Sequence, residues 1–198
     1  MDSQNVISYK DSFIDEVSRS LCIVMEYAES GDLYSQIEKH VMNGTRFEEE
    51  EIWKVLIHIV KGLVAIHNLS VMHRDLKSAN VFMFKDFQAK LGDFNVSKVM
   101  KMGLEYTQTG TPYYASPEVW KDKPYGPTSD IWSLGVVIYE MTELVPPFKA
   151  DSMDELYTQV LEGKYKKINK RYSRELSFVL RSLLQVQPSK RPDASQIL

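Results

Sequence analysis

Residues 73–80 of this chain read HRDLKSAN, and residues 93–95 read DFN. These two short stretches contain two carboxylates, Asp75 and Asp93, together with the amine of Lys77 and the amide of Asn80. Mg²⁺ prefers hard oxygen ligands and keeps several waters, so one amide oxygen and one carboxylate are enough protein ligands beside a phosphate. The joint pattern therefore indicates a site that handles a metal-bound phosphate.

The same letters resemble the active-site half of protein kinases, which reads H-R-D-L-x-x-x-N and then D-F-G. Only Asn95 departs from that pattern, in place of the final glycine. The resemblance implies that Asp75 accepts the proton of the substrate hydroxyl and that Lys77 contacts the transferred γ-phosphate. It implies Mg²⁺ ligation by Asn80 and Asp93, so ATP and Mg²⁺ are the expected cofactors. Asparagine tolerates positive φ, and we expect Asp93 to remain usable in a stiffer loop.

Upstream, the stretch VMEYAESGDL resembles the kinase hinge, which binds adenine through backbone groups. The resemblance implies that Met25 is the gatekeeper and that the Glu26 carbonyl and the Ala28 backbone face the adenine edge. Asp32 would lie near the ribose, and Phe82 would form the floor of the adenine pocket. Taken alone, the methionine and the phenylalanine are typical core residues, and only their register with the catalytic loop favours a nucleotide site.

Downstream, GTPYY followed by SPE resembles the end of a kinase activation segment. The resemblance implies a buried bidentate ion pair between Glu118 and Arg191 that fixes this segment. It also implies that Asp130, at the start of the central helix, anchors the backbone of the catalytic loop. These three residues are expected to act structurally.

Regulation is expected at the activation loop. In kinases with an arginine before the catalytic aspartate, here Arg74, a phosphate on this loop pairs with the arginine and orders the loop. Thr107 and Thr109 are the candidate phosphorylation sites, and Thr107 fits the family pattern better. Two solvated loop threonines are the alternative. Thr111 is expected to make a fixed contact to Asp75 and Lys77.

Lys77 and Thr111 resemble serine/threonine kinases more than tyrosine kinases, and the hinge and activation-segment letters resemble NIMA-related kinases most. The resemblance covers residues 5–198 and implies transfer of the γ-phosphate of Mg-ATP to Ser or Thr of a protein substrate. Ala79 leaves the catalytic loop without an acidic residue to attract a basic substrate side chain, so a strong preference for basic substrates is not expected.

Hydrophobic periodicity predicts an α+β fold that is mostly helical and has two strands at its N-terminus. The kinase resemblance implies that the helical part is a C-terminal lobe and that the two strands are a remnant of an N-terminal lobe. We assign residues 1–27 to that remnant and the start of the hinge, and residues 28–198 to the helical lobe. A capping box, TRFE, is expected to open the longest helix, and residues 93–118 to form a long loop. The expected strands are 6–13, 21–27, 81–84 and 89–91, and the expected helices are 32–42, one with apolar residues from 52 to 66, 129–144, and one opening at 173.

Composition limits the class of protein. A net charge of −3 gives no indication of a nucleic-acid partner, and no apolar run is long enough to cross a membrane. The single cysteine, Cys22, excludes an internal disulfide and is expected to be a small buried hydrophobe. We expect a cytoplasmic protein, with a nuclear or cytoskeletal location as alternatives, and the oligomeric state stays open.

No glycine-rich loop and no strand lysine precede the hairpin in this sequence, although kinases use both to hold phosphates. The intact catalytic and metal-binding residues favour a serine/threonine kinase of which this sequence is a fragment. The lack of a glycine-rich loop and a strand lysine in this sequence favours a truncated pseudokinase that acts as a non-catalytic binding or scaffold module. An unrelated phosphate-binding protein is a third alternative. For the chain by itself we expect very low transfer activity.

Overall fold

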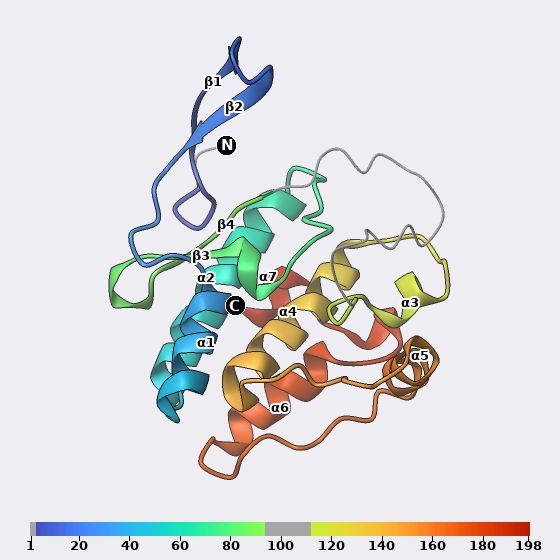
Figure 1. Ribbon diagram of the computed structural model, residues 1–198. Helices are drawn as coiled ribbons and strands as arrows, with labels where there is room; N and C mark the ends of the chain where they lie inside the picture. Colours follow the sequence, from blue (N-terminus) through green and yellow to red (C-terminus); the bar gives the residue numbers. More distant parts are fainter. Residues whose placement is uncertain (1–2, 94–111) are drawn as a thin grey trace.

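A two-stranded hairpin stands apart from a helical body in the computed structural model, which describes residues 3–93 and 112–198 (Figure 1). The architecture is α+β and mostly helical, as predicted, with two separate two-stranded sheets. Helix α4 lies in the middle of the body and packs against α2 and α6. The elements in chain order are β1 (Tyr9–Asp15), β2 (Ser20–Met25), α1 (Leu33–Asn43), α2 (Glu49–His67), η1 (Ser78–Asn80), β3 (Val81–Met83), η2 (Lys85–Phe87), β4 (Ala89–Leu91), α3 (Pro117–Trp120), α4 (Pro127–Glu143), α5 (Met153–Glu162), α6 (Arg174–Leu183), η3 (Pro188–Lys190) and α7 (Ala194–Ile197).

The hairpin begins three residues later than predicted. Val6 forms a parallel bridge to Leu91 of β4, and the Ile7 N–H donates to the Leu91 carbonyl at 2.8 Å. Those two residues therefore belong to the helical body, and β1 starts beyond them. No residue of β1 or β2 is buried, and Cys22 is half-buried. The prediction of a buried cysteine was wrong, because no second layer among the described residues covers the hairpin.

Helix α2 also begins later than its predicted cap. Glu51 Oε2 accepts from the Glu48 N–H at 2.8 Å, which places the N-terminal cap three residues beyond Thr45. Phe47, fully buried, belongs to the same core cluster as Ile52 in the first turns of the helix. An apolar residue before the cap and one in the next turn fix the entry angle of a helix, so this pair sets the start.

Helices α2 and α4 supply more of the core than any other two elements. The predicted apolar face of α2 is buried, and α4 is buried on nearly all sides, as its sequence indicated. Full burial of one such aliphatic side chain contributes about 1.5–3 kcal/mol. The buried face of α2 contains Ile52, Val55, Leu56, Ile59, Val60, Leu63 and Ile66.

Strands β3 and β4 form the predicted antiparallel pair, with Val81 opposite Leu91 and Met83 opposite Ala89. The pair lies against α2 and connects to the hinge side of the molecule, because the Met83 N–H donates to the Gly31 carbonyl at 2.8 Å. Residues 73–80 precede β3 and Asp93 follows β4, so the two predicted motifs leave the strand pair at the same end.

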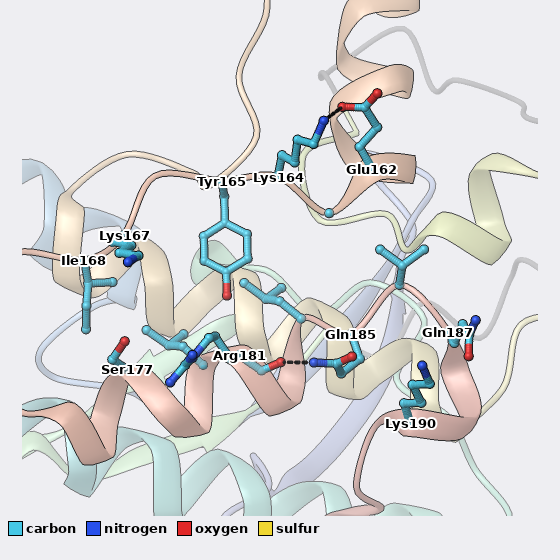
Figure 2. Close-up of a pocket in the computed structure, with 14 residues that line it drawn as sticks. Glu162, Lys164, Tyr165, Lys167, Ile168, Ser177, Arg181, Gln185, Gln187 and Lys190 are labelled. Carbon is cyan, nitrogen blue, oxygen red and sulfur yellow. Dashed lines mark hydrogen bonds and ion pairs between the residues drawn. The ribbon is translucent and has the colours of Figure 1, made fainter.

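The sequence reading did not anticipate helices α3 and α5. Ser152 caps α5 by accepting from the Glu155 N–H at 3.2 Å, and Gly163 ends it in a left-handed conformation. A pocket of about 630 Å³ lies between the end of α5, the segment that follows it and α6 (Figure 2). No helix in the described part of the chain is long and apolar enough to cross a membrane.

Candidate active site

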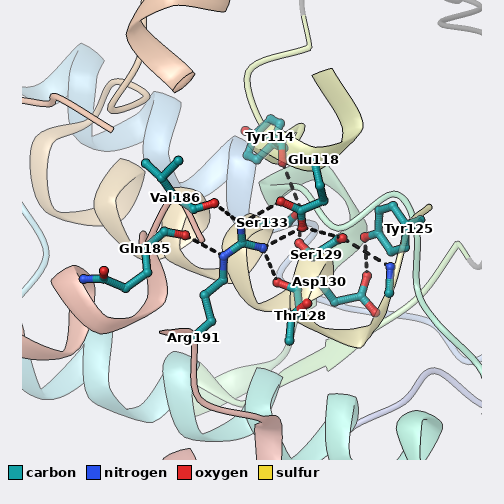
Figure 3. A network of polar contacts seen from close by, with 11 residues as sticks. Tyr114, Glu118, Tyr125, Thr128, Ser129, Asp130, Ser133, Gln185, Val186 and Arg191 are labelled. Atoms are coloured by element: carbon teal, nitrogen blue, oxygen red, sulfur yellow. Dashed lines mark hydrogen bonds and ion pairs between the residues drawn. The ribbon is translucent and has the colours of Figure 1, made fainter. Parts of the chain in front are cut away.

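The catalytic loop is held by one buried carboxylate, Asp130 of α4, which is fully excluded from solvent (Figure 3). Its Oδ2 accepts from the His73 N–H at 3.0 Å and from His67 Nε2 at 2.8 Å. Its Oδ1 accepts from the Arg74 N–H at 3.1 Å and from the Tyr125 hydroxyl at 2.6 Å. Burial alone raises the pKa of the Asp130 carboxyl, but these four hydrogen bonds together hold it below its ordinary value.

Three of the predicted site residues converge in the catalytic loop. Lys77 Nζ lies 2.9 Å from Asp75 Oδ2, and Asn80 Nδ2 donates to the Asp75 backbone carbonyl at 2.7 Å and to its Oδ2 at 3.2 Å. The 3₁₀ turn η1 brings the asparagine back over the aspartate. Both charged side chains keep about a third of their surface exposed, 31% for Asp75 and 37% for Lys77. They can therefore reach a bound substrate.

The second motif lies beside the first because of a backbone bond. The Gly92 N–H donates to the Asn80 carbonyl at 3.1 Å, so Asp93 follows directly after a residue paired with the catalytic loop. At Gly92 an added Cβ would meet the Phe82 ring at 2.6 Å, and this close approach requires glycine. Asp93 itself has a φ of 53°. The strand pair thus brings the asparagine and this carboxylate together from two loops.

Several predicted residues lie outside the described part of the chain. These are Asn95 and the three regulatory threonines Thr107, Thr109 and Thr111. The expected contact of Thr111 with the catalytic aspartate, and the choice between the phosphorylation sites, stay predictions.

The donor set fits Mg²⁺ bound together with a nucleotide. Within residues 3–93 and 112–198, no group of three or more His, Cys, Asp or Glu side chains is placed to hold a metal ion alone. Mg²⁺ in nucleotide sites is held by one or two carboxylates, substrate phosphates and waters. Asn80 and Asp93 supply an amide oxygen and a carboxylate of that kind, and they would be the protein ligands.

The hinge residues are placed at the base of the hairpin. Met25 ends β2 and is 46% exposed. The Glu26 N–H donates to the Ser8 carbonyl at 2.9 Å, and its carboxylate accepts from the Ser8 N–H at 3.2 Å and from Lys90 Nζ. Burial alone raises the pKa of Glu26, but these bonds hold it below its ordinary value. The Glu26 carbonyl and the Ala28 N–H bond to no other described residue, whereas the Ala28 carbonyl accepts from a glycine N–H in a turn.

Asp32 and Phe82 lie side by side in an antiparallel bridge. Asp32 Oδ1 accepts from the Ser35 N–H at 2.7 Å and caps helix α1, so one of its carboxylate oxygens already has a structural role. The Phe82 ring is half-buried against Gly92. Both residues therefore lie between the hinge and the metal-binding loop.

The structure contains the ion pair between Glu118 and Arg191 (Figure 3). Two parallel hydrogen bonds of 2.7 Å join Arg191 Nη1 and Nη2 to the two carboxylate oxygens. The arginine side chain is fully buried, donates through Nε to the Gln185 carbonyl, and lies 5.1 Å from the centre of the Trp132 ring. Burial alone raises the pKa of Glu118, but the bonds from Arg191 and Ser129 hold it below its ordinary value.

Sequence reasoning missed a second link between the activation segment and the catalytic loop. The Tyr114 hydroxyl donates to Glu140 Oε2 at 2.7 Å and lies 3.0 Å from the Ser78 hydroxyl. Burial raises the pKa of Glu140 and of the Tyr114 phenol. The signal was Glu140, a carboxylate within the apolar run of α4, which a buried polar partner has to satisfy.

Comparison with known proteins agrees with this geometry. Residues 1–198 match the protein kinase domain family. The chain is 40% identical to human serine/threonine-protein kinase Nek2 over 201 residues, which is 98% of the chain and 45% of the relative. It is 39% identical to the probable serine/threonine-protein kinase nek2 of Dictyostelium discoideum, with 98% of the chain and 48% of the relative covered. It is 38% identical to mouse Nek1, with 100% of the chain and 16% of the relative covered.

The chain thus spans about half, or less, of the length of these curated relatives. The predicted resemblance to NIMA-related serine/threonine kinases is confirmed. By its match over all 198 residues, the chain belongs to the protein kinase domain family.

Proposed function

We propose that this chain carries the catalytic lobe of a serine/threonine kinase that transfers the γ-phosphate of Mg-ATP to Ser or Thr of a protein. In this proposal residues 1–27 are the remnant of the N-terminal lobe with the start of the hinge, and residues 28–198 are the catalytic lobe. The observation that carries it is the contact set among Asp75, Lys77 and Asn80, because a pure scaffold has no physical need for an exposed carboxylate paired with a lysine and an amide.

Each residue has a distinct part in the proposed reaction. Asp75 accepts the proton of the substrate hydroxyl as its oxygen attacks the γ-phosphorus, and the bond to the β-phosphate oxygen breaks. Lys77 neutralises charge on the transferred group while orienting the aspartate. Asn80 and Asp93 would hold Mg²⁺, which supplies charge neutralisation at the phosphates when bound. Positioning and charge neutralisation account for most of the catalysis that such transfer requires.

The hinge supports adenine binding through main-chain groups. The Glu26 carbonyl and the Ala28 N–H supply one acceptor and one donor two residues apart in the chain, and neither is used by another described residue. Phe82 would pack against the purine face, and the free oxygen of Asp32 would reach the ribose. Met25 would close the rear of the site.

The test is Mg²⁺-dependent transfer of labelled phosphate from ATP to dephosphorylated casein. Asp75→Asn keeps the size of the side chain and removes the proton acceptor, so transfer should fall by about 10²-fold or more. Asp86→Asn is the matched control, because Asp86 is an exposed aspartate of η2 with a positive φ and no assigned role. Equal rates of phosphate transfer in wild type and Asp75→Asn would contradict the proposed mechanism.

A chain that folds but gives transfer too low to measure is tested by nucleotide binding. A fluorescent ATP analogue should bind only with Mg²⁺, and Asp93→Asn should weaken that binding by about tenfold through loss of one metal ligand. Absence of Mg²⁺-dependent binding in the folded wild type would contradict the assignment of the nucleotide site.

A binding module is the second candidate, and the hairpin favours it. Phe13 and Ile14 of β1 and Leu21 of β2 are 54%, 71% and 66% exposed, an apolar surface that a partner could cover. In that case the casein assay shows no transfer and the nucleotide analogue does not bind, while the chain stays folded. These two measurements therefore separate the candidates.

A further inference from the structure

We propose that the pocket between α5 and α6 binds an acidic segment of a partner protein, with an apolar side chain of that segment on the pocket floor and its carboxylates on a basic rim. The pocket is lined by the end of α5, the segment after it, α6 and the start of η3. None of the lining residues belongs to the hinge or the catalytic loop. The inference is therefore independent of phosphoryl transfer.

The floor of the pocket is apolar. Leu180 and Leu184 form it and are buried, at 0% and 4% exposure, and Ile168 and Val186 complete it as half-buried side chains. Its volume of about 630 Å³ falls within the range of pockets that enclose a ligand. The floor can therefore accept one large apolar side chain of a peptide.

The rim of the pocket is basic. Lys164, Lys167, Arg181 and Lys190 line it and are exposed, while Glu162 is the one acidic lining residue and pairs with Lys164 at 3.0 Å. The other three cations form no ion pair within the described part of the chain. Figure 2 shows Lys167 and Lys190 on opposite sides of the pocket, with Arg181 between them. Three uncompensated cations around one concave surface attract carboxylates from more than one direction.

This positive charge contrasts with the rest of the molecule. The net charge of the whole chain is −3, yet the segment GKYKKINKR at residues 163–171 contains five basic residues and no acidic one. Two of these five, Lys164 and Lys167, line the pocket, and Arg181 and Lys190 add to the positive charge there. A local field of this sign steers an acidic partner to the pocket and away from the remaining surface.

Tyr165 supplies a directional group. Its ring packs edge-on against Tyr139 at 5.6 Å and Phe148 at 5.8 Å, which fixes its position, and its hydroxyl points into the pocket in Figure 2. The hydroxyl makes no hydrogen bond with another described residue. Burial raises the pKa of the Tyr165 phenol, and nearby Arg181 opposes the rise. The phenol therefore stays protonated at neutral pH and can donate to a carboxylate.

The wall of the pocket is formed by a close backbone contact. Gly163 ends α5 at a φ of 62°, and a Cβ at this position would lie 2.5 Å from Val186 Cγ2. The glycine thus lets the end of α5 meet the segment after α6. A wall fixed in this way keeps the pocket open before a ligand arrives, which lowers the ordering penalty of binding.

An acidic peptide fits these features better than a lipid surface or a nucleic acid does. A bilayer or a duplex would contact only the exposed rim and would leave the apolar floor unused. A peptide with large apolar residues between carboxylates can place one of them on the floor and use the tyrosine and the rim at the same time. Recognition of acidic motifs by clusters of basic side chains is a recurring mode of peptide binding.

The probe is a fluorescein-labelled peptide of sequence EEDLFEE, titrated with the chain by fluorescence anisotropy at near-physiological salt and without ATP. The pocket variant combines Lys167→Glu and Arg181→Glu. The matched control combines Lys39→Glu and Lys61→Glu, which are exposed lysines of α1 and α2 and give the same change in net charge. The pocket variant should bind at least about tenfold more weakly, and the control within about twofold of wild type.

A second peptide, EEDSSEE, tests the floor and should bind about tenfold more weakly than the first, because it lacks the apolar anchor. If the pocket variant fails to melt cooperatively, Lys167→Gln and Lys190→Gln replace it, since they remove charge without reversing it. Equal weakening in pocket and control variants, or equal binding of the two peptides, overturns the proposal. Pocket-dependent binding of an RNA oligomer, a phosphoserine peptide or anionic vesicles in preference to EEDLFEE overturns it as well.

Discussion

Arg191 and Glu118 are 73 residues apart in the chain and form a buried, two-bond ion pair next to the ring of Trp132. The arginine also donates to the backbone carbonyls of residues 128, 185 and 186, so one side chain joins α3, the start of α4 and the segment after α6. Replacement of only one residue of such a pair is destabilising, because the other residue is then left charged, buried and without its counter-ion.

Removal of one partner should therefore be strongly destabilising. Arg191→Ala should lower the free energy of unfolding by about 3–5 kcal/mol, measured by urea denaturation. Arg174→Ala, at an exposed position of α6, is the control and should stay within about 0.5 kcal/mol. A similar small change for both variants would mean that the pair has no such role.

Glu140 should give an unusual dependence of stability on pH. Burial raises the pKa of Glu140 above its ordinary 4.5, so the folded state binds this proton more tightly than the unfolded state does. Its favourable contribution is present below pH 4.5 and is lost as the pH rises through the raised pKa. Glu140→Gln removes the ionisable carboxyl group, and with it this dependence on pH, and keeps an acceptor for the Tyr114 hydroxyl.

The glutamine variant should therefore gain stability relative to wild type at neutral pH, and that gain should shrink towards pH 4. Urea denaturation at both pH values gives the comparison, with Glu175→Gln, an exposed residue of α6, as a control that shows no such trend. A gain that grows as the pH falls would contradict the raised pKa.

Gly92 should resist substitution because of the ring beside it. Gly92→Ala places a methyl group 2.6 Å from Phe82 and should destabilise the fold by about 1–3 kcal/mol, measured by thermal or urea denaturation. Gly126→Ala meets nothing within 4 Å and is the control. Phe82→Leu combined with Gly92→Ala should recover part of the loss, and a loss unchanged by the smaller side chain would mean that the ring is not its cause.

Gly163 and Gly44 form a matched pair for the pocket wall. Both have a φ of 62° at the end of a helix, but a Cβ at Gly163 would lie 2.5 Å from Val186, whereas nothing lies within 4 Å of a Cβ at Gly44. Alanine at either position incurs the same backbone strain. The extra destabilisation of Gly163→Ala should be about 1–3 kcal/mol and isolates the contact. Equal effects of the two variants, measured by thermal denaturation, would show that Val186 moves aside without penalty.

The sequence predicted the parts of the fold that depend on local spacing. The catalytic loop could be predicted because its polar residues lie within eight positions. Helix α2 could be predicted from apolar periodicity, and α4 from its nearly continuous run of apolar residues. The start of β1 could not be predicted, because Val6 pairs with Leu91, a residue far away in the sequence. Cys22 was misjudged because burial depends on a covering layer that a strand pattern does not reveal.

The candidate site was likewise predictable only where its residues are close together in the sequence. The motif placed Asp75, Lys77 and Asn80 together, and the geometry brings them within hydrogen-bonding distance. The capping role of Asp32 and the partnership of Tyr114 with Glu140 were not foreseen, because each depends on which backbone or hydroxyl group lies opposite in three dimensions. Helix α5 could have been read from Ser152 and Gly163, which are ordinary cap residues at its two ends.

The carboxylate of Asp130 has a consequence for how the molecule opens. Both of its oxygens are saturated by donors from the end of α2, from the catalytic loop and from the segment before α4. The amide protons of His73 and Arg74 therefore point into the most buried helix rather than into solvent. In hydrogen exchange they should be released only when that helix unfolds, so the catalytic loop and the core melt as one cooperative unit.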